Sequence, residues 1–140
     1  MPKLLFNSGQ SIEQLENDYR KNPDASYPLV EKCQAYRKIP VDQLSIEQLR
    51  LLVGQEIGLP FLVPKALQQL TKNILVEGDL YAGDLLSTVL SINNGYWQEH
   101  PVERKELLEL LDNRKMQLEA SNQSSSLRQL FKKIDAFVHA

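Results

Sequence analysis

The pentapeptide Ser-Ile-Glu-Gln-Leu occurs twice in this chain, at residues 11–15 and 45–49. In both copies a glutamine follows the serine by three residues. This is the spacing of a capping box, in which each side chain accepts a hydrogen bond from a free backbone N–H at the start of a helix. The residues after the two copies differ, so we interpret the pentapeptide as a shared helix start and not as a duplicated unit. A chain with such signals is constrained toward a helical fold.

Apolar residues recur three and four positions apart through most of the chain, as they do on the inward face of helices. Pro64 suits the first turn of a helix, where its missing N–H costs no hydrogen bond. Residues 85–92 carry no charge and predict a short buried helix, which Asn93-Asn94-Gly95 would end in left-handed backbone. A later helix is expected to begin near Pro101. No stretch alternates apolar and polar residues for long enough to indicate a sheet.

The end of the chain predicts one more helix after a polar hinge at residues 121–126 (SNQSSS). Its apolar residues at helical spacing are Leu127, Leu130, Phe131, Ile134 and Val138, and its polar face carries Arg128, Lys132 and Lys133, as a solvated face does. The expected fold class is all-α, a single-domain multi-helix bundle or irregular helical array of about seven helices over residues 1–140. Residues 11–120 form its body, and residues 121–140 form the C-terminal helix after the Ser-rich hinge.

The net charge of −2 argues against a protein that binds nucleic acid directly. The charge is uneven, however. Residues 1–58 have eight acidic and seven basic side chains (−1), residues 59–112 have eight and four (−4), and residues 113–140 have two and five (+3). The acidic middle is either an ordinary solvated surface or a docking face for a basic partner, since complementary potentials speed encounter.

Cys33 is the only cysteine, so the chain can form no internal disulfide, which fits a reducing compartment. No window approaches the roughly 18 apolar residues that a membrane span needs. We therefore expect a soluble, cytoplasmic protein that does not contact membranes. On the apolar face of its helix, Cys33 is more typical of a small core residue than of a nucleophile.

Catalytic signals are sparse. His100 and His139 are isolated, and the chain has none of the motifs of zinc sites or phosphate-binding loops. Glu77, Asp79 and Asp84 lie close enough in sequence to bind a divalent cation, but their spacing is not that of an EF-hand loop. The other interpretations are that Asp79 or Asp84 caps the following helix, or that these carboxylates contact a partner.

Tyr96-Trp97 is the only adjacent aromatic pair and is expected in the link between two helices. One interpretation is a hydrophobic plug that closes the bundle. The other is an exposed anchor, because Trp and Tyr are favoured at interfaces.

Several segments together resemble the immunity proteins of bacterial contact-dependent growth inhibition systems (the CdiI-like family). The segments are LENDY at 15–19, LVEKCQAYRKIPVDQLSIEQLR at 29–50, LRLLVGQEIGLPFLVPKALQQL at 49–70, EGDLYAGDLLSTVL at 77–90 and WQEHP at 97–101. The resemblance covers roughly Ser11 to Leu111, and the tail from about Met116 onward departs from it.

This resemblance implies an immunity protein that binds the C-terminal toxin domain of a cognate effector and blocks it without catalysis or a cofactor. Many such toxins are nucleases, whose active sites are basic because their substrate is polyanionic. We therefore expect a basic toxin domain as partner. The expected toxin-binding residues are Glu77, Asp79, Tyr81, Asp84, Trp97, Glu99 and Glu103. Two alternatives stay open: a helical adaptor or regulatory subunit unrelated to toxins, and an enzyme that uses a divalent ion at Glu77, Asp79 and Asp84.

Overall fold

The computed structural model describes residues 6–19, 27–120 and 125–140. The helices of this part of the chain are α1 (Ile12–Glu16), α2 (Pro28–Tyr36), the short 3₁₀ helix η1 (Val41–Gln43), α3 (Ile46–Gly54), α4 (Leu59–Lys72), α5 (Asp84–Leu90), α6 (Asn94–Glu99), α7 (Pro101–Asn113), α8 (Lys115–Ala120) and α9 (Ser125–Val138). The described residues form no strand and only two isolated bridges. The all-α prediction is therefore confirmed. None of these helices has the length and apolar character needed to cross a membrane.

Both copies of the repeated pentapeptide start helices, as predicted. The Ser11 hydroxyl accepts a hydrogen bond from the backbone N–H of Gln14, whose side chain accepts one from the Ser11 N–H. Ser45 and Gln48 form the same capping box at the start of α3. The identical residues thus give an identical local structure in two places, although α1 stops after five residues, at a left-handed Asn17.

The start of α4 differs from the prediction. The helix begins at Leu59, because Gly58 adopts a left-handed φ of 63° that turns the chain and Pro60 occupies the first turn. Pro64 therefore lies inside the helix, where its missing N–H leaves the carbonyl of Pro60 without its usual partner. A side chain at Gly58 would meet the Ile12 side chain at 2.8 Å, so the turn also depends on a close approach to α1.

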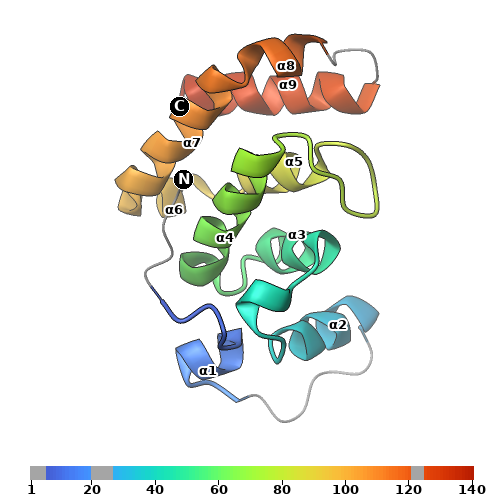
Figure 1. Ribbon diagram of the computed structural model, residues 1–140, viewed down its shortest axis with the longest axis vertical. Coiled ribbons are helices and arrows are strands. Elements are labelled where there is room, and N and C mark those ends of the chain that lie inside the picture. The colour runs from blue at the N-terminus through green and yellow to red at the C-terminus, as the bar shows by residue number, and fades with distance from the viewer. Residues whose placement is uncertain (1–5, 20–26, 121–124) are drawn as a thin grey trace.

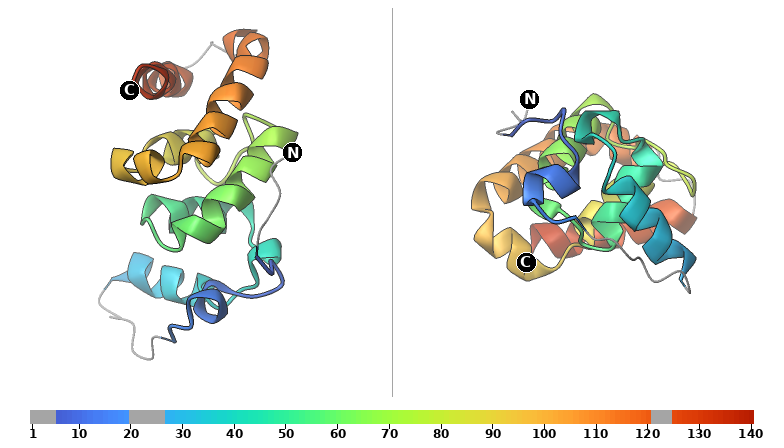
Figure 2. Two further views of the ribbon diagram at one scale, coloured as in Figure 1. Left: turned by 90° about the vertical axis from the view of Figure 1, so that its left-hand side faces the viewer. Right: turned by 90° about the horizontal axis from the view of Figure 1, so that it is seen from below.

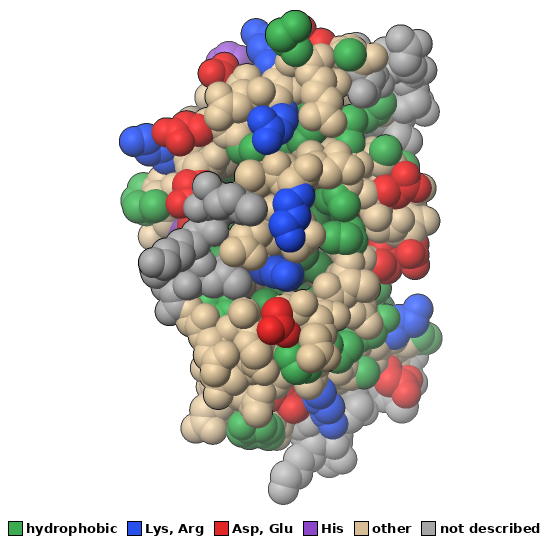
Figure 3. Space-filling model, viewed as in Figure 1, with side chains coloured by type: hydrophobic (Ala, Val, Ile, Leu, Met, Phe, Trp, Pro, Cys, Tyr) green, Lys and Arg blue, Asp and Glu red, His purple; other side chains and the backbone are tan. Residues whose placement is uncertain are grey.

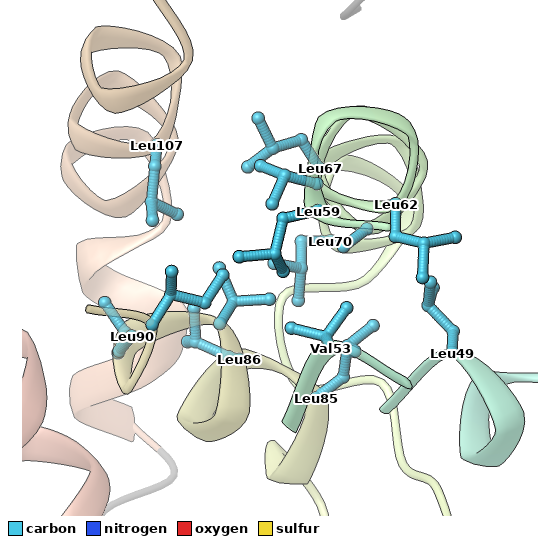
Figure 4. Packing of buried hydrophobic residues seen from close by; sticks show 14 of the residues in the cluster. Leu49, Val53, Leu59, Leu62, Leu67, Leu70, Leu85, Leu86, Leu90 and Leu107 are labelled. Carbon is cyan, nitrogen blue, oxygen red and sulfur yellow. The ribbon is translucent and has the colours of Figure 1, made fainter. Parts of the chain in front are cut away.

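The core lies between α3, α4 and α5, and α7 packs against α4 (Figure 4). Leucine and valine side chains from these four helices converge there; they include Leu49, Val53, Leu62, Leu70, Leu85, Leu86 and Leu107, each no more than 1% exposed. Each fully buried side chain of this size contributes about 1.5–3 kcal/mol. The apolar residues of the uncharged stretch at 85–92 belong to this core, which confirms the predicted short buried helix.

The helices form an elongated array, with α1 and α2 at one end and α8 and α9 at the other (Figures 1 and 2). The segment that was expected to close the buried helix instead opens α6. Asn93 has a φ of −56°, and its side chain accepts a hydrogen bond from the Tyr96 N–H at 2.8 Å. Tyr96 and Trp97 therefore belong to a helix and not to a link. A break at Arg114 separates α7 from α8, and the described residues form nine α-helices, close to the expected number of about seven.

The C-terminal helix α9 packs on α5. Leu127, Leu130 and Phe137 are buried, and the Phe137 ring meets Trp97 edge-on, with centroids 5.2 Å apart. Lys133 was expected on a solvated face, but its Nζ donates a hydrogen bond to Ser87 Oγ at 2.8 Å. Of the expected apolar stripe, Val138 is 44% exposed. The first four residues of the predicted hinge, 121–124, lie outside the described residues.

Candidate functional site

The loop between α4 and α5 is held in place by two carboxylates. Asp84, 1% exposed, accepts hydrogen bonds from the backbone N–H of Gly78 at 2.7 Å and of Leu80 at 3.1 Å. Glu47, which lies on α3, accepts one from the N–H of Asp79 at 2.9 Å. Three successive loop amides are therefore bound to side-chain oxygens. Asp84 satisfies the loop backbone and not the start of its own helix, which corrects the predicted helix cap; the N-cap residue is Gly83.

Arg50 fixes both carboxylates. Its Nε donates a hydrogen bond to Glu47 Oε1 at 2.7 Å, and the same atom lies 3.7 Å from Asp84 Oδ2. The hydrogen bond from Arg50 holds the pKa of Glu47 below its ordinary value. Because the guanidinium lies between two carboxylates on different helices, it ties the α4–α5 loop to α3.

A side chain at either of two loop glycines would crowd neighbouring side chains. A Cβ at Gly78 would meet Glu47 Oε1 at 2.7 Å and Asp84 Oδ2 at 3.0 Å. Gly83 has a φ of 90°, and a Cβ there would meet side-chain atoms of Leu130 at 3.0 Å and of Leu75 at 3.1 Å. The EGDLYAGD segment is therefore a compact, pre-formed loop whose far side rests on α9.

The loop presents a small apolar and acidic surface. Glu77 and Asp79 are exposed, Tyr81 is half-buried, and Leu80 is 62% exposed. In Figure 3, acidic side chains lie along the edge of the face on the side where Figure 1 places this loop, while basic side chains run down the middle. The sequence-based prediction missed Leu80. The signal available was a leucine next to an acidic residue in a turn-rich segment, where a side chain has little to pack against.

The other predicted contact residues lie at the corner between α6 and α7. Trp97 is 2% exposed, so it is the hydrophobic plug and presents no anchor to a partner. Glu103 is half-buried, and its Oε2 accepts a hydrogen bond from the Tyr96 hydroxyl at 2.5 Å. Glu99 is exposed. The Tyr96 ring stacks on His100, with centroids 3.9 Å apart.

Burial raises the pKa of Glu103, although the Tyr96 hydroxyl opposes this rise. Burial also raises the pKa of Tyr96, and its hydrogen bond to Glu103 adds to the effect. In this pair the Tyr96 hydroxyl is the donor and the Glu103 carboxylate is the acceptor of a hydrogen bond inside the corner. This use of Glu103 is structural in the free protein.

The structure does not bring the seven predicted residues onto one surface. Glu77, Asp79, Tyr81 and Asp84 lie in or beside the α4–α5 loop, whereas Trp97, Glu99 and Glu103 lie on or after α6. The buried helix α5 runs from the α4–α5 loop toward α6. The loop and α6 lie on opposite sides of the array in Figures 1 and 2. The exposed residues of the prediction that share one surface are Glu77 and Asp79, with Tyr81 half-buried beside them.

The described part of the chain contains no group of three or more His, Cys, Asp or Glu side chains placed to hold a metal ion. In the loop, both Asp84 oxygens already accept backbone N–H groups. Cys33 is buried, and burial raises the pKa of its thiol, which leaves less of the reactive thiolate.

Comparison with known proteins identifies the family. A sequence model of the family described as CDI immunity proteins matches residues 14–107. Searches of curated proteins and of solved structures gave no match. The matched segment contains the whole α4–α5 loop and ends within α7, before α8 and α9. The family pattern thus covers two thirds of the chain, including the loop that Asp84 and Glu47 hold, and the chain belongs to the CDI immunity protein family.

Proposed function

We propose that this protein protects its cell by binding the C-terminal toxin domain of a contact-dependent growth inhibition effector and blocking it without catalysis. The observation that carries the proposal is the family match over residues 14–107. The work would be done in the cytoplasm, where a delivered toxin domain meets its target.

The α4–α5 loop is the surface that we assign to this role within the family-matched segment. Its backbone is fixed before any partner arrives, which lowers the entropic cost of binding. It offers an exposed apolar side chain, Leu80, on the same loop as the exposed carboxylates of Glu77 and Asp79. Such an arrangement suits a basic surface with a small apolar recess.

The finer part of the proposal is that the toxin is a nuclease. A cleft that binds a polyanion is basic, and carboxylates on a rigid loop would compete with the phosphates for it. Glu77 and Asp79 are the residues that we expect to make these contacts. Glu99 remains a separate candidate on the opposite side of the molecule.

A growth competition tests the function itself. Cells that make this chain should survive contact with cells displaying the effector encoded beside its gene, and cells without the chain should die. The purified chain should also bind the isolated toxin domain in a calorimetric titration. Equal killing of both strains, together with no detectable binding, would contradict the proposal.

Charge reversal tests the loop. The double substitution Glu77→Lys/Asp79→Lys should weaken toxin affinity at least about tenfold, since a charge placed opposite a like charge opposes association. The matched control is Glu31→Lys/Asp42→Lys, which makes the same charge change at exposed positions on α2 and η1. Unfolding curves in urea should remain close to that of the unmodified chain for both variants. Equal affinity of the two variants would remove the loop from the interface.

A further inference from the structure

A groove lies between α9 on one side and α7 and α8 on the other, with a volume of about 590 Å³. Its apolar lining comes from all three helices: Leu108, Leu111, Leu118, Phe131, Ile134 and Val138. The groove exists because α9 packs more extensively on α5 than on either α7 or α8. One face of α9 therefore packs on the core, and a second apolar face lines the groove.

The contacts of α9 fix the width of this groove. Leu130 lies against the position that a Gly83 side chain would occupy, Lys133 donates to Ser87, and Phe137 meets Trp97. On the other wall, Arg114 between α7 and α8 donates a hydrogen bond to the carbonyl of Thr71 at 3.1 Å. Both walls of the groove are thus attached to the body of the protein, and these contacts hold the walls apart.

The charged residues among the lining are mostly acidic. Asp112, Glu119 and Asp135 come from α7, α8 and α9 respectively, against Lys115 as the one lysine, with His139 beside them. All three carboxylates are exposed. An apolar floor with carboxylates on both walls matches a helix that has one apolar face and basic residues flanking it.

Every residue that lines the groove lies beyond residue 107, where the family match ends. The segment that the family model matches therefore does not include the lining of the groove. Members of one family that must each recognise a different partner need contact positions that differ among them, because specificity is a difference of affinities.

We infer that this groove binds a basic amphipathic helix of the cognate toxin domain and sets which toxin the chain recognises. The inference rests on the proposed function, since it names a second contact with the same partner. The α4–α5 loop would then supply the contact common to the family, and the groove would supply discrimination.

The test uses the full chain and the toxin domain encoded by the neighbouring gene. Glu119→Lys/Asp135→Lys, which reverses one carboxylate on each wall, should weaken affinity about tenfold or more, and the loss should shrink at high salt. Val138→Ala, which removes apolar surface from the groove, should weaken it about fivefold with no change in salt dependence. The control Glu31→Lys/Asp42→Lys makes the same charge change at the far end of the array (Figure 1) and should bind normally.

Hydrogen exchange supplies a readout that does not depend on substitutions. Complex formation should slow exchange in α8 and α9 and in one helical, basic segment of the toxin domain. Protection of an acidic or extended toxin segment against this groove would overturn the inference. So would a free chain that dimerises through the groove, with groove variants that become monomeric and keep full toxin affinity.

The two proposals fail in different ways. If the unmodified chain neither binds the toxin domain nor protects cells, the proposed function is wrong. If it binds and protects, but Glu119→Lys/Asp135→Lys and Val138→Ala keep full affinity, only the assignment of the groove is wrong.

Discussion

The α4–α5 loop and the α7–α9 groove are built by opposite means. The loop has three successive backbone N–H groups bound to the carboxylates of Asp84 and Glu47, and it lies inside the family-matched segment. The groove is bounded by apolar side chains, and its lining lies wholly outside that segment. A hydrogen-bonded loop tolerates few changes because each lost partner leaves a backbone N–H without the hydrogen bond that holds the loop. The groove tolerates more changes at Leu108, Phe131, Ile134 and Val138, the four apolar lining residues that are at least partly exposed. The difference also separates a segment that the family model covers from one that it does not.

The largest expected effect comes from breaking the loop at its centre. Asp84→Ala should lower the free energy of unfolding by about 3–5 kcal/mol, because it removes the partner of two loop amides and the buried one of the two carboxylates beside Arg50. Urea denaturation measures this. The matched change in the groove, Asp112→Ala, removes an exposed carboxylate and should stay within about 0.5 kcal/mol. Equal losses from the two substitutions would mean that the loop and the groove do not differ in this way.

A smaller effect is expected where the loop meets α9. Gly83→Ala should cost about 1–3 kcal/mol, because alanine is strained at a φ of 90° and its Cβ would meet Leu130 and Leu75. Gly54→Ala is the control, since a Cβ there meets only Thr88 at an ordinary 3.5 Å. Thermal unfolding of both variants compares them. If Gly83→Ala had the same thermal unfolding midpoint as Gly54→Ala, the contact between the loop and α9 would be looser than the structure indicates.

The smallest effect concerns pH and contrasts the loop with the α6–α7 corner. The lowered pKa of Glu47 gives stability that is present above its ordinary pKa and lost as pH falls through the folded value. The raised pKa of Glu103 has the opposite sign: its contribution is present at low pH and lost as pH rises through the folded value.

Urea unfolding between about pH 4 and pH 7 should therefore separate two variants. Glu47→Gln should lose stability relative to the unmodified chain as pH rises, whereas Glu103→Gln should gain. Parallel curves for the two variants would show that the environments of these carboxylates do not differ as described.

Local signals in the sequence predicted much of the helical fold. The capping boxes at Ser11 and Ser45 depend on residues three positions apart, and the burial of α5 follows from a stretch without charge. The prediction was wrong where a contact with a residue distant in the sequence determines the surroundings of a side chain. Lys133 belongs to an ordinary polar face in the sequence, but Ser87, 46 positions away, gives its ammonium a partner.

The candidate site was predictable only in part for the same reason. The sequence drew attention to Glu77, Asp79 and Asp84, but it could not show that Asp84 turns inward to the loop backbone. The bond from the Asp79 N–H to Glu47 spans 32 positions along the chain. Trp97 is buried by Phe137, which comes from a helix that the family match does not reach.

The division of α9 into a seated face and an open face has a consequence for how such proteins diversify. Residues 131, 134 and 138 line the groove, whereas 130, 133 and 137 contact the α4–α5 loop, α5 and α6, so substitutions on the groove side, above all at the exposed Val138, disturb the second set least. A new effector variant could therefore be matched by a few exchanges along a single outward stripe, with the rest of the polypeptide inherited unchanged.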